Sequence, residues 1–336
     1  MTSTRRQPPT TEDAPPASLT RRFARREVLS RGSLVGIWIL LFILYSIIEP
    51  GTFWQSGTFK TIFGSQFELV LMSVALICVL VVGEIDLSIA SSLGLAGTLV
   101  PILAVQQGWP LWLATIAAVL AAGAVGVING ILVVVIGVDA IVATLGMATF
   151  VLGITLWISH LNAAEGLSAA YSEMAIRNIF GLPLAFYYGI VASLLLAYVL
   201  TMTPLGRRMG FVGSSREVAR LAGVNVNRIR FGAYIASGLI CGIAGVLLSA
   251  SLGGFDPNTS AQYLLPALAA VFLGTAVIQP GKFNPIGALI AVYFLQTGIV
   301  GLELKGFTGW IEDVFYGGVL VLAVAATHLI RRRTAS

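Results

Sequence analysis

The sequence has little charge. Of its 336 residues, only 10% are Asp, Glu, Lys or Arg, whereas 57% are hydrophobic. Soluble globular domains carry about 25% charged residues, so this composition excludes an ordinary soluble domain. Apolar runs near the roughly 20 residues that a helix needs to cross a bilayer recur along most of the chain. The composition therefore predicts an all-α polytopic membrane protein.

Cysteine, histidine and nucleotide-binding motifs are also scarce. Cys78 and Cys241 each lie in an apolar run without CxxC or metal-ligand spacing, which favours packing over a metal site or a disulfide. His160 and His328 stand at the ends of predicted spans without a carboxylate or cysteine nearby in the sequence. A membrane enzyme is therefore disfavoured. The chain also has no G-x-x-x-x-G-K-[ST] segment, so it lacks the loop that cradles nucleotide phosphates.

The apolar runs predict eight to ten membrane spans, with ten preferred. Some runs are short or rich in glycine, and 264–279 is typical of the broken or re-entrant helices of transport proteins. The glycine-rich stretches GAVGVING (123–130) and GLICGIAG (238–245) predict close packing of helices. The predicted spans are 34–49, 67–82, 89–105, 111–137, 141–159, 184–202, 231–253, 264–279, 284–301 and 312–329.

Lys and Arg gather in three segments. Seven of the 20 lie in a Pro- and Thr-rich arm, 1–32, which is predicted to be disordered. Six lie between Arg207 and Arg230, and three stand in the tail 331–336. Cytoplasmic loops carry these residues in excess, so the arm and the tail are both expected in the cytoplasm. The transmembrane domain would then be 33–330, with six spans before the central basic segment and four after it.

The central segment, 203–230, contains a candidate docking helix. Ser214 and Glu217 have the S-x-x-E spacing of a capping box, and Gly223 is placed to end the helix in a left-handed conformation. The pattern predicts a helix of about two turns, Ser215 to Ala222, which is too short to be stable alone in water. Two interpretations stay open: a solvated connector that topology keeps basic, or a helix that docks onto a cytoplasmic protein.

A second candidate is the stretch GEIDLS, which places Glu84 and Asp86 between two apolar runs. An even number of preceding spans puts it at a turn near the cytoplasmic boundary. Water or backbone N–H groups are expected to solvate both carboxylates there. Asp86 is predicted to cap the following span, with Ser88 in the same role. Participation of Asp86 in gating or on the ATPase-facing side stays a second possibility.

Four stretches resemble the permease subunits of bacterial ABC importers for monosaccharides, of the ribose, xylose and galactose type. The most specific pieces are IDLS at 85–88 and ARLAGVNVNR at 219–228. The family pattern is usually glycine-rich where this chain has Glu84, Ala90, Ala276 and Gln279-Pro280, which leaves the particular substrate open. The four stretches are 83–97, 129–154, 203–253 and 267–292, within a resemblance that covers about residues 35–330.

The resemblance implies a transporter subunit in the bacterial plasma (inner) membrane, not an enzyme. Similar permeases pair into a dimer, take substrate from an extracellular or periplasmic sugar-binding protein, and work with two cytoplasmic ABC ATPase subunits that bind the ATP. This chain is expected to bind no cofactor, metal or nucleic acid itself. Such permeases insert a coupling helix into a cleft of the ATPase. The matching residues here are Ser214, Ser215, Arg216, Glu217, Val218, Arg220, Leu221 and Gly223.

Within the coupling helix, Val218 and Leu221 are expected to form the apolar centre of the contact with the ATPase. Arg216, Glu217 and Arg220 are expected to supply polar contacts around it.

The resemblance favours a monosaccharide or related polyol as substrate. Branched-chain amino-acid and nucleoside ABC permeases are the alternatives. An ion-coupled secondary transporter is disfavoured because the predicted spans hold almost no ionisable residues, with Glu68 assigned to a span end. A neutral sugar needs hydrogen-bonding side chains in an otherwise apolar conduit, although such side chains also join helices to one another. The candidates are Ser88, Ser91, Ser92, Asn129, Thr144, Thr149, Ser237 and Gln296.

Overall fold

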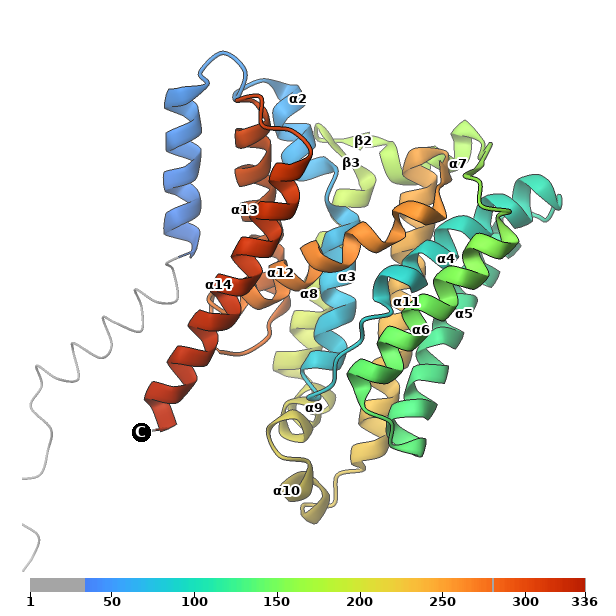
Figure 1. The fold of residues 1–336 in the computed structure, drawn as a ribbon, viewed down its shortest axis with the longest axis vertical. Coiled ribbons are helices and arrows are strands. Elements are labelled where there is room, and N and C mark those ends of the chain that lie inside the picture. The colour runs from blue at the N-terminus through green and yellow to red at the C-terminus, as the bar shows by residue number, and fades with distance from the viewer. Residues whose placement is uncertain (1–33, 280, 336) are drawn as a thin grey trace, which may run out of the picture.

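Helices form most of the chain that the computed structural model describes, residues 34–279 and 281–335 (Figure 1). Within this part, seven helices are long and apolar enough to cross a membrane. Each of the ten predicted spans contains a helix, but the number that cross the membrane, eight to ten, stays a prediction. The seven helices are Ser56–Leu80, Ile89–Gln106, Leu111–Ile136, Ala140–Ile158, Leu184–Met202, Val226–Leu252 and Pro285–Glu303.

Several of these spans change helix type along their length. The first half of the bundle, after the shorter apolar helix Leu34–Ile48, consists of α2 (Ser56–Phe59), the π-helix η1 (Lys60–Gly64), α3 (Phe67–Leu80), α4 (Ile89–Pro101), η2 (Ile102–Gln106), α5 (Leu111–Gly130), η3 (Ile131–Ile136), α6 (Ala140–Ile158), α7 (Ala169–Ile176) and α8 (Leu184–Met202). The second half consists of α9 (Pro204–Ser214), α10 (Arg216–Leu221), α11 (Val226–Leu252), the 3₁₀ helix η4 (Pro257–Tyr263), α12 (Leu264–Gly274), α13 (Pro285–Glu303) and α14 (Trp310–Ala335).

Four two-residue strands join segments at one end of the bundle. Ala164–Glu165 (β1) pairs antiparallel with Gly254–Phe255 (β4), and Asn178–Ile179 (β2) pairs with Leu182–Pro183 (β3). The β1–β4 pair ties the connector between α6 and α7 to the chain just beyond α11.

The helix α12 has 11 residues, too few to cross a bilayer, as expected of a broken helix at 264–279. It crosses the bundle obliquely in Figure 1, and it packs on α13, α14 and α3.

The two ends of the bundle differ in charge. We call the lower end in Figure 1 the basic end, because α9 and α10 with their arginines lie there. The C-terminal end of α14 lies toward the same end in Figure 1. We call the opposite end, with α2, α7 and the strands, the far end. The predicted arm 1–32 lies outside the described residues.

Close contacts between glycines and backbone carbonyls hold the centre of the fold. A Cβ atom at Gly126 of α5 would overlap the carbonyl oxygen of Tyr234, and one at Gly245 of α11 would overlap that of Leu93. The helices α4 and α5 therefore approach α11 at backbone distance, which only glycine permits at these positions. The close packing predicted for 123–130 and 238–245 is confirmed.

Substitution of Gly245 should weaken this packing. In Gly245→Ala the new methyl group meets the Leu93 carbonyl and forces α4 away from α11, which we expect to lower the free energy of unfolding by about 2 kcal/mol. Thermal unfolding of the purified protein in nanodiscs measures the change. Gly232→Ala is the matched control, because nothing lies within 4 Å of a Cβ atom at that position of α11. Equal unfolding midpoints for the two variants would contradict the packing argument.

Candidate functional site

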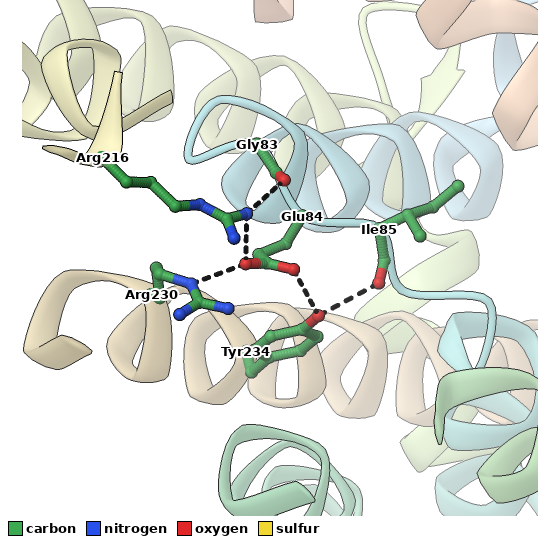
Figure 2. Close-up of polar contacts among 6 residues, drawn as sticks. All are labelled: Gly83, Glu84, Ile85, Arg216, Arg230 and Tyr234. Atoms are coloured by element: carbon green, nitrogen blue, oxygen red, sulfur yellow. Dashed lines mark hydrogen bonds and ion pairs between the residues drawn. The ribbon is translucent and has the colours of Figure 1, made fainter. Parts of the chain in front are cut away.

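The connector between α3 and α4 contains a buried acid at the basic end. It turns at Gly83, whose φ of 76° lies in the left-handed region that favours glycine. The next residue, Glu84, has a side chain that is only 4% exposed. Its Oε1 atom accepts hydrogen bonds from Arg216 Nη2 and from Arg230 Nε, each at 2.6 Å (Figure 2). Glu84 thus joins the connector to both α10 and α11.

Two further contacts complete this cluster, which we call the Glu84 cluster: Gly83, Glu84, Ile85, Arg216, Arg230 and Tyr234. The second guanidinium bond of Arg216 goes from Nη2 to the carbonyl oxygen of Gly83 at 2.8 Å. The Tyr234 hydroxyl lies 3.5 Å from Glu84 Oε2 and 3.2 Å from the carbonyl oxygen of Ile85. Bonds between ionised groups are the stronger class of hydrogen bond, so the two arginines dominate the cluster.

The prediction that water or backbone N–H groups solvate Glu84 and Asp86 holds for Asp86, which accepts from the Ser88 N–H, but Glu84 is bound by arginine side chains. Both residues are buried, with 6% and 1% of their surface exposed. The physical reason is that α9 and α11 pack over the connector. A Cβ atom at Gly213, near the end of α9, would overlap the carbonyl oxygen of Val81. The chain therefore replaces solvent around Glu84 with its own guanidinium groups.

Asp86 is surrounded by neutral hydrogen-bond donors. Its Oδ1 atom accepts from the backbone N–H of Ser88 at 2.9 Å and from Ser88 Oγ at 2.7 Å. Its Oδ2 atom accepts from Ser237 Oγ at 3.1 Å. Asn129 Nδ2 donates to Ser88 Oγ at 2.8 Å and lies 3.4 Å from Asp86 Oδ1. Burial raises the pKa of the Asp86 carboxyl, and the bonds from Ser88 and Ser237 act in the opposite direction.

The predicted role of Asp86 as N-cap of the following span is wrong. Ser88 is the N-cap residue of α4, and its side chain makes no capping bond because it is engaged by Asp86 and Asn129. Asp86 lies two residues earlier and instead connects the connector to α5 and α11.

Of the eight residues proposed for a substrate path, four lie together and four lie apart. Ser88, Asn129 and Ser237 surround Asp86, and Thr144 Oγ1 accepts from the Leu87 N–H at 3.1 Å. The other four lie apart: Ser91 donates to the Ala148 carbonyl, Ser92 is buried in α4, Thr149 is exposed on α6, and Gln296 lies on α13. The first group therefore joins helices, which was the alternative stated for such residues.

The predicted helix in the central segment is confirmed as α10, Arg216–Leu221, with Gly223 at a φ of 80° beyond its end. The capping box is wrong by one residue. Ser215 is the N-cap, and its Oγ accepts from the Val218 N–H at 3.4 Å. Ser214 ends α9 and donates to the carbonyl of Gly210. The prediction was shifted by one residue because α9 continues to Ser214. Ser215 is therefore the extended residue that precedes α10.

The outer surface of α10 carries two exposed aliphatic side chains beside the exposed charged residues Arg216, Glu217 and Arg220. Leu221 is 84% exposed and Val218 is 51% exposed, whereas Ala219 is fully buried. Arg216 binds Glu84 with a side chain that is still 45% exposed, and its predicted contact with a partner stays a prediction. The helix thus presents two aliphatic side chains at the basic end, while Arg216 fixes its other side to the connector.

Two members of the Glu84 cluster, Arg230 and Tyr234, had no place in the predicted site. Their spacing of four residues puts them on one face of α11, which is the signal that could have linked them to each other. Their links to Glu84 span 146 and 150 residues of sequence and have no local signal. Among the residues that the structure describes, no group of three His, Cys, Asp or Glu residues could hold a metal ion.

Comparison with known proteins gives matches over most of the chain. The profile of one family, described as "Branched-chain amino acid transport system / permease component", matches residues 59–324. An L-arabinose ABC transporter permease protein of Azospirillum brasilense is 28% identical over 324 residues, which are 95% of this chain and 94% of the relative.

Two further relatives give similar figures. A D-allose transport system permease protein of Escherichia coli is 28% identical over 300 residues, 88% of this chain and 92% of the relative. An autoinducer 2 import system permease protein of Salmonella typhimurium is 31% identical over 272 residues, 78% and 81% of the two chains. No solved structure matches the chain.

Removal of the Glu84 carboxylate should destabilise the basic end. In Glu84→Ala, Arg230 keeps its charge in a position where its side chain is only 13% exposed. Because an unpaired buried charge is costly, we expect the free energy of unfolding to fall by about 3 kcal/mol. Thermal and denaturant unfolding in nanodiscs measure this loss. The control is Glu173→Ala, an exposed carboxylate of α7. A Glu84→Ala protein as stable as this control would show that the cluster contributes nothing to folding.

Proposed function

This chain belongs to the family of permease components of branched-chain amino acid transport systems, and we propose that it forms the translocation path of an ATP-binding-cassette importer for a monosaccharide or related polyol. The observation that carries the proposal is α10, a short helix with exposed Val218 and Leu221 at the basic end. Such a helix gains stability by packing into a groove of another protein. The groove would belong to the ATPase subunit that binds and hydrolyses the ATP.

The substrate class is supported by the named relatives. The resemblance to sugar permeases that the IDLS and ARLAGVNVNR stretches indicate is confirmed by relatives whose names state L-arabinose, D-allose and autoinducer 2 as cargo. The family description names branched-chain amino acids, so an amino-acid substrate stays the second candidate.

Glu68 bears on whether transport is coupled to ions. It was predicted to lie at a span end, but it lies within the helix Ser56–Leu80 and is 6% exposed. One buried carboxylate is therefore present in a span. An ion-coupled carrier is therefore no longer disfavoured by a lack of ionisable residues in the spans. It is disfavoured because the chain belongs to the permease family.

The proposed partners follow from the two ends of the bundle. Two ATPase subunits would bind α10 at the basic end, on the cytoplasmic side of a bacterial plasma membrane. A sugar-binding protein would deliver substrate at the far end, and a second copy of the permease would complete a homodimer. Both termini would be cytoplasmic, in agreement with the excess of Arg in the arm, the central segment and the tail.

The Glu84 cluster supports a route by which the ATPase could act on the helices. Any shift of α10 pulls on Arg216, whose guanidinium group holds Gly83 and Glu84 in the connector between α3 and α4. Arg230 links the same carboxylate to α11. Closure of the ATPase subunits would thus move the basic ends of three helices together. Transport requires such a two-state element whose equilibrium nucleotide and substrate bias differently.

The double variant Glu217→Ala/Leu221→Asp tests the docking role of α10. Placing a carboxylate at the centre of the apolar contact should reduce copurification of the ATPase subunits and ATP-dependent uptake by at least about tenfold, which corresponds to about 1.4 kcal/mol. Leu161→Asp makes the same change at a leucine that is 69% exposed at the far end, and it should leave copurification unchanged. Normal uptake by a folded double variant would remove the assignment of α10.

The choice between sugar and amino acid can be tested on the binding protein that is proposed to deliver the substrate. Thermal unfolding of that protein is measured with L-arabinose, D-allose, other pentoses and hexoses, sugar alcohols and leucine. We expect its midpoint to rise with one or more polyols, because ligand that binds only the folded state stabilises it. A rise with leucine-like ligands alone would reject the sugar proposal in favour of the second candidate.

A further inference from the structure

Two interrupted helices meet in the part of the bundle nearer the far end. The span Ser56–Leu80 breaks at Ser65 and Gln66, between the π-helix η1 and α3. The short helix α12 begins only after the 3₁₀ helix η4, and it packs against α3. Irregular backbone at membrane depth is tolerated where it lines a cavity, and transporters place substrate sites at such breaks.

A cavity of about 520 Å³ lies at this meeting point. Its volume falls within the range of about 300–1,000 Å³ that small-molecule sites occupy. Gln66 and Glu68 line it from the break and the first turn of α3, Tyr263 from the end of η4, and Gln296 and Tyr316 from α13 and α14. The cavity is thus assembled from segments that are far apart in sequence.

The most unusual group in this cavity is the Glu68 carboxylate. The residue is 6% exposed, and its Oε2 atom has no hydrogen-bond partner among the described residues. A buried carboxylate without a partner is expensive, and an ionisable residue inside a span usually marks a functional site. The Oε2 atom of Glu68 is therefore available to bond a ligand.

The neighbouring groups add both donors and acceptors. Gln66 is the N-cap residue of α3 and makes no side-chain capping bond, while the first N–H groups of any helix lack partners within the helix. Gln66 and Gln296 are 8% and 9% exposed, so both amides are held in place. The Tyr316 hydroxyl lies 3.5 Å from Gln296 Oε1.

We propose that this cavity binds a neutral polyol directly on the permease, with Glu68 as the central acceptor; the proposal rests on the proposed function. Each hydroxyl group of a polyol can donate to the Glu68 carboxylate and accept from an amide or a backbone N–H. The rings of Tyr263 and Tyr316 provide apolar surface for the carbon skeleton.

Charge argues for a neutral ligand over an amino acid. The lining contains no Lys or Arg, and Glu312 and Asp313 add two further acids. The three acids would favour the ammonium group of an amino acid, but its carboxylate would find no Lys or Arg among the lining residues. A neutral polyol needs no such cation.

Glu68 and Tyr263 also line a second cavity, likewise of about 520 Å³, on the side of Lys60 and Ser251. The two cavities therefore share Glu68 as part of their common wall. A ligand that moves between them remains within reach of the same carboxylate.

The test measures binding to the whole importer, permease with its ATPase subunits, in nanodiscs without nucleotide. Saturation-transfer-difference NMR with L-arabinose and D-allose as probes, and leucine as the amino-acid comparison, detects weak ligands directly. We expect a signal from at least one sugar and none from leucine. The affinity should fall at least tenfold in Glu68→Ala and less in Glu68→Gln, which keeps one acceptor oxygen. The control Glu173→Gln changes an exposed carboxylate outside the cavity and should bind as the wild type does.

Gln296→Met provides a second variant from a different helix, in case Glu68→Ala fails to assemble. It keeps the side-chain volume while removing the amide, and we expect a loss of about threefold or more. The site would be overturned if the wild type, Glu68→Gln and Gln296→Met bound sugar with equal affinity. It would also be overturned if the wild type gave a signal with leucine, or no signal with any sugar. ATP-dependent sugar uptake by the same importer would still uphold the proposed function. Failure of the site and failure of the function are thus distinguishable.

Discussion

The basic end of this protein depends on one buried carboxylate between two guanidinium groups. Glu84 cannot remain charged at 6% exposure without compensation, and Arg216 and Arg230 each supply it at 2.6 Å. These two ion pairs hold the connector between α3 and α4 against α10 and α11, because separating the buried charges would be costly. A six-residue helix such as α10 has too few internal bonds to be stable alone, so this attachment also determines how its exposed Leu221 is presented.

The two ends of the bundle use opposite solutions for backbone within a membrane protein. Around α11, glycines let α4 and α5 pack at backbone distance, and a large apolar cluster packs beside the buried polar groups at Glu84 and Asp86. Toward the far end, the breaks before α3 and α12 interrupt regular helix and expose polar groups to a cavity. The ordered core would carry movement from α10, and the interrupted helices would hold the ligand. The helix α3 connects the two sites. Its first turn contains Glu68, which lines the cavity, and its other end leads into the connector that contains Glu84.

Part of the candidate site could be predicted and part could not. The helix at Arg216–Leu221 and the left-handed Gly223 were predictable because capping and helix termination depend on residues a few positions apart. The direction of Arg216 was not, because its partner Glu84 lies 132 residues away. Likewise, Ser88, Asn129 and Ser237 share the residue type of a sugar path, but their positions around Asp86 follow from the packing of α4, α5 and α11.

The sequence by itself determined the class of the protein, the approximate positions of the apolar helices, the three basic segments and the short helix of the central segment. These follow from composition and local periodicity, which act along the chain. Only the tertiary structure decided which acids are buried and what surrounds them. Glu84 and Glu68 were both assigned to solvated or terminal positions, yet one is held by two arginines and the other has an unpaired oxygen in a cavity. Burial depends on which helices pack together, and no pattern within a single helix specifies that.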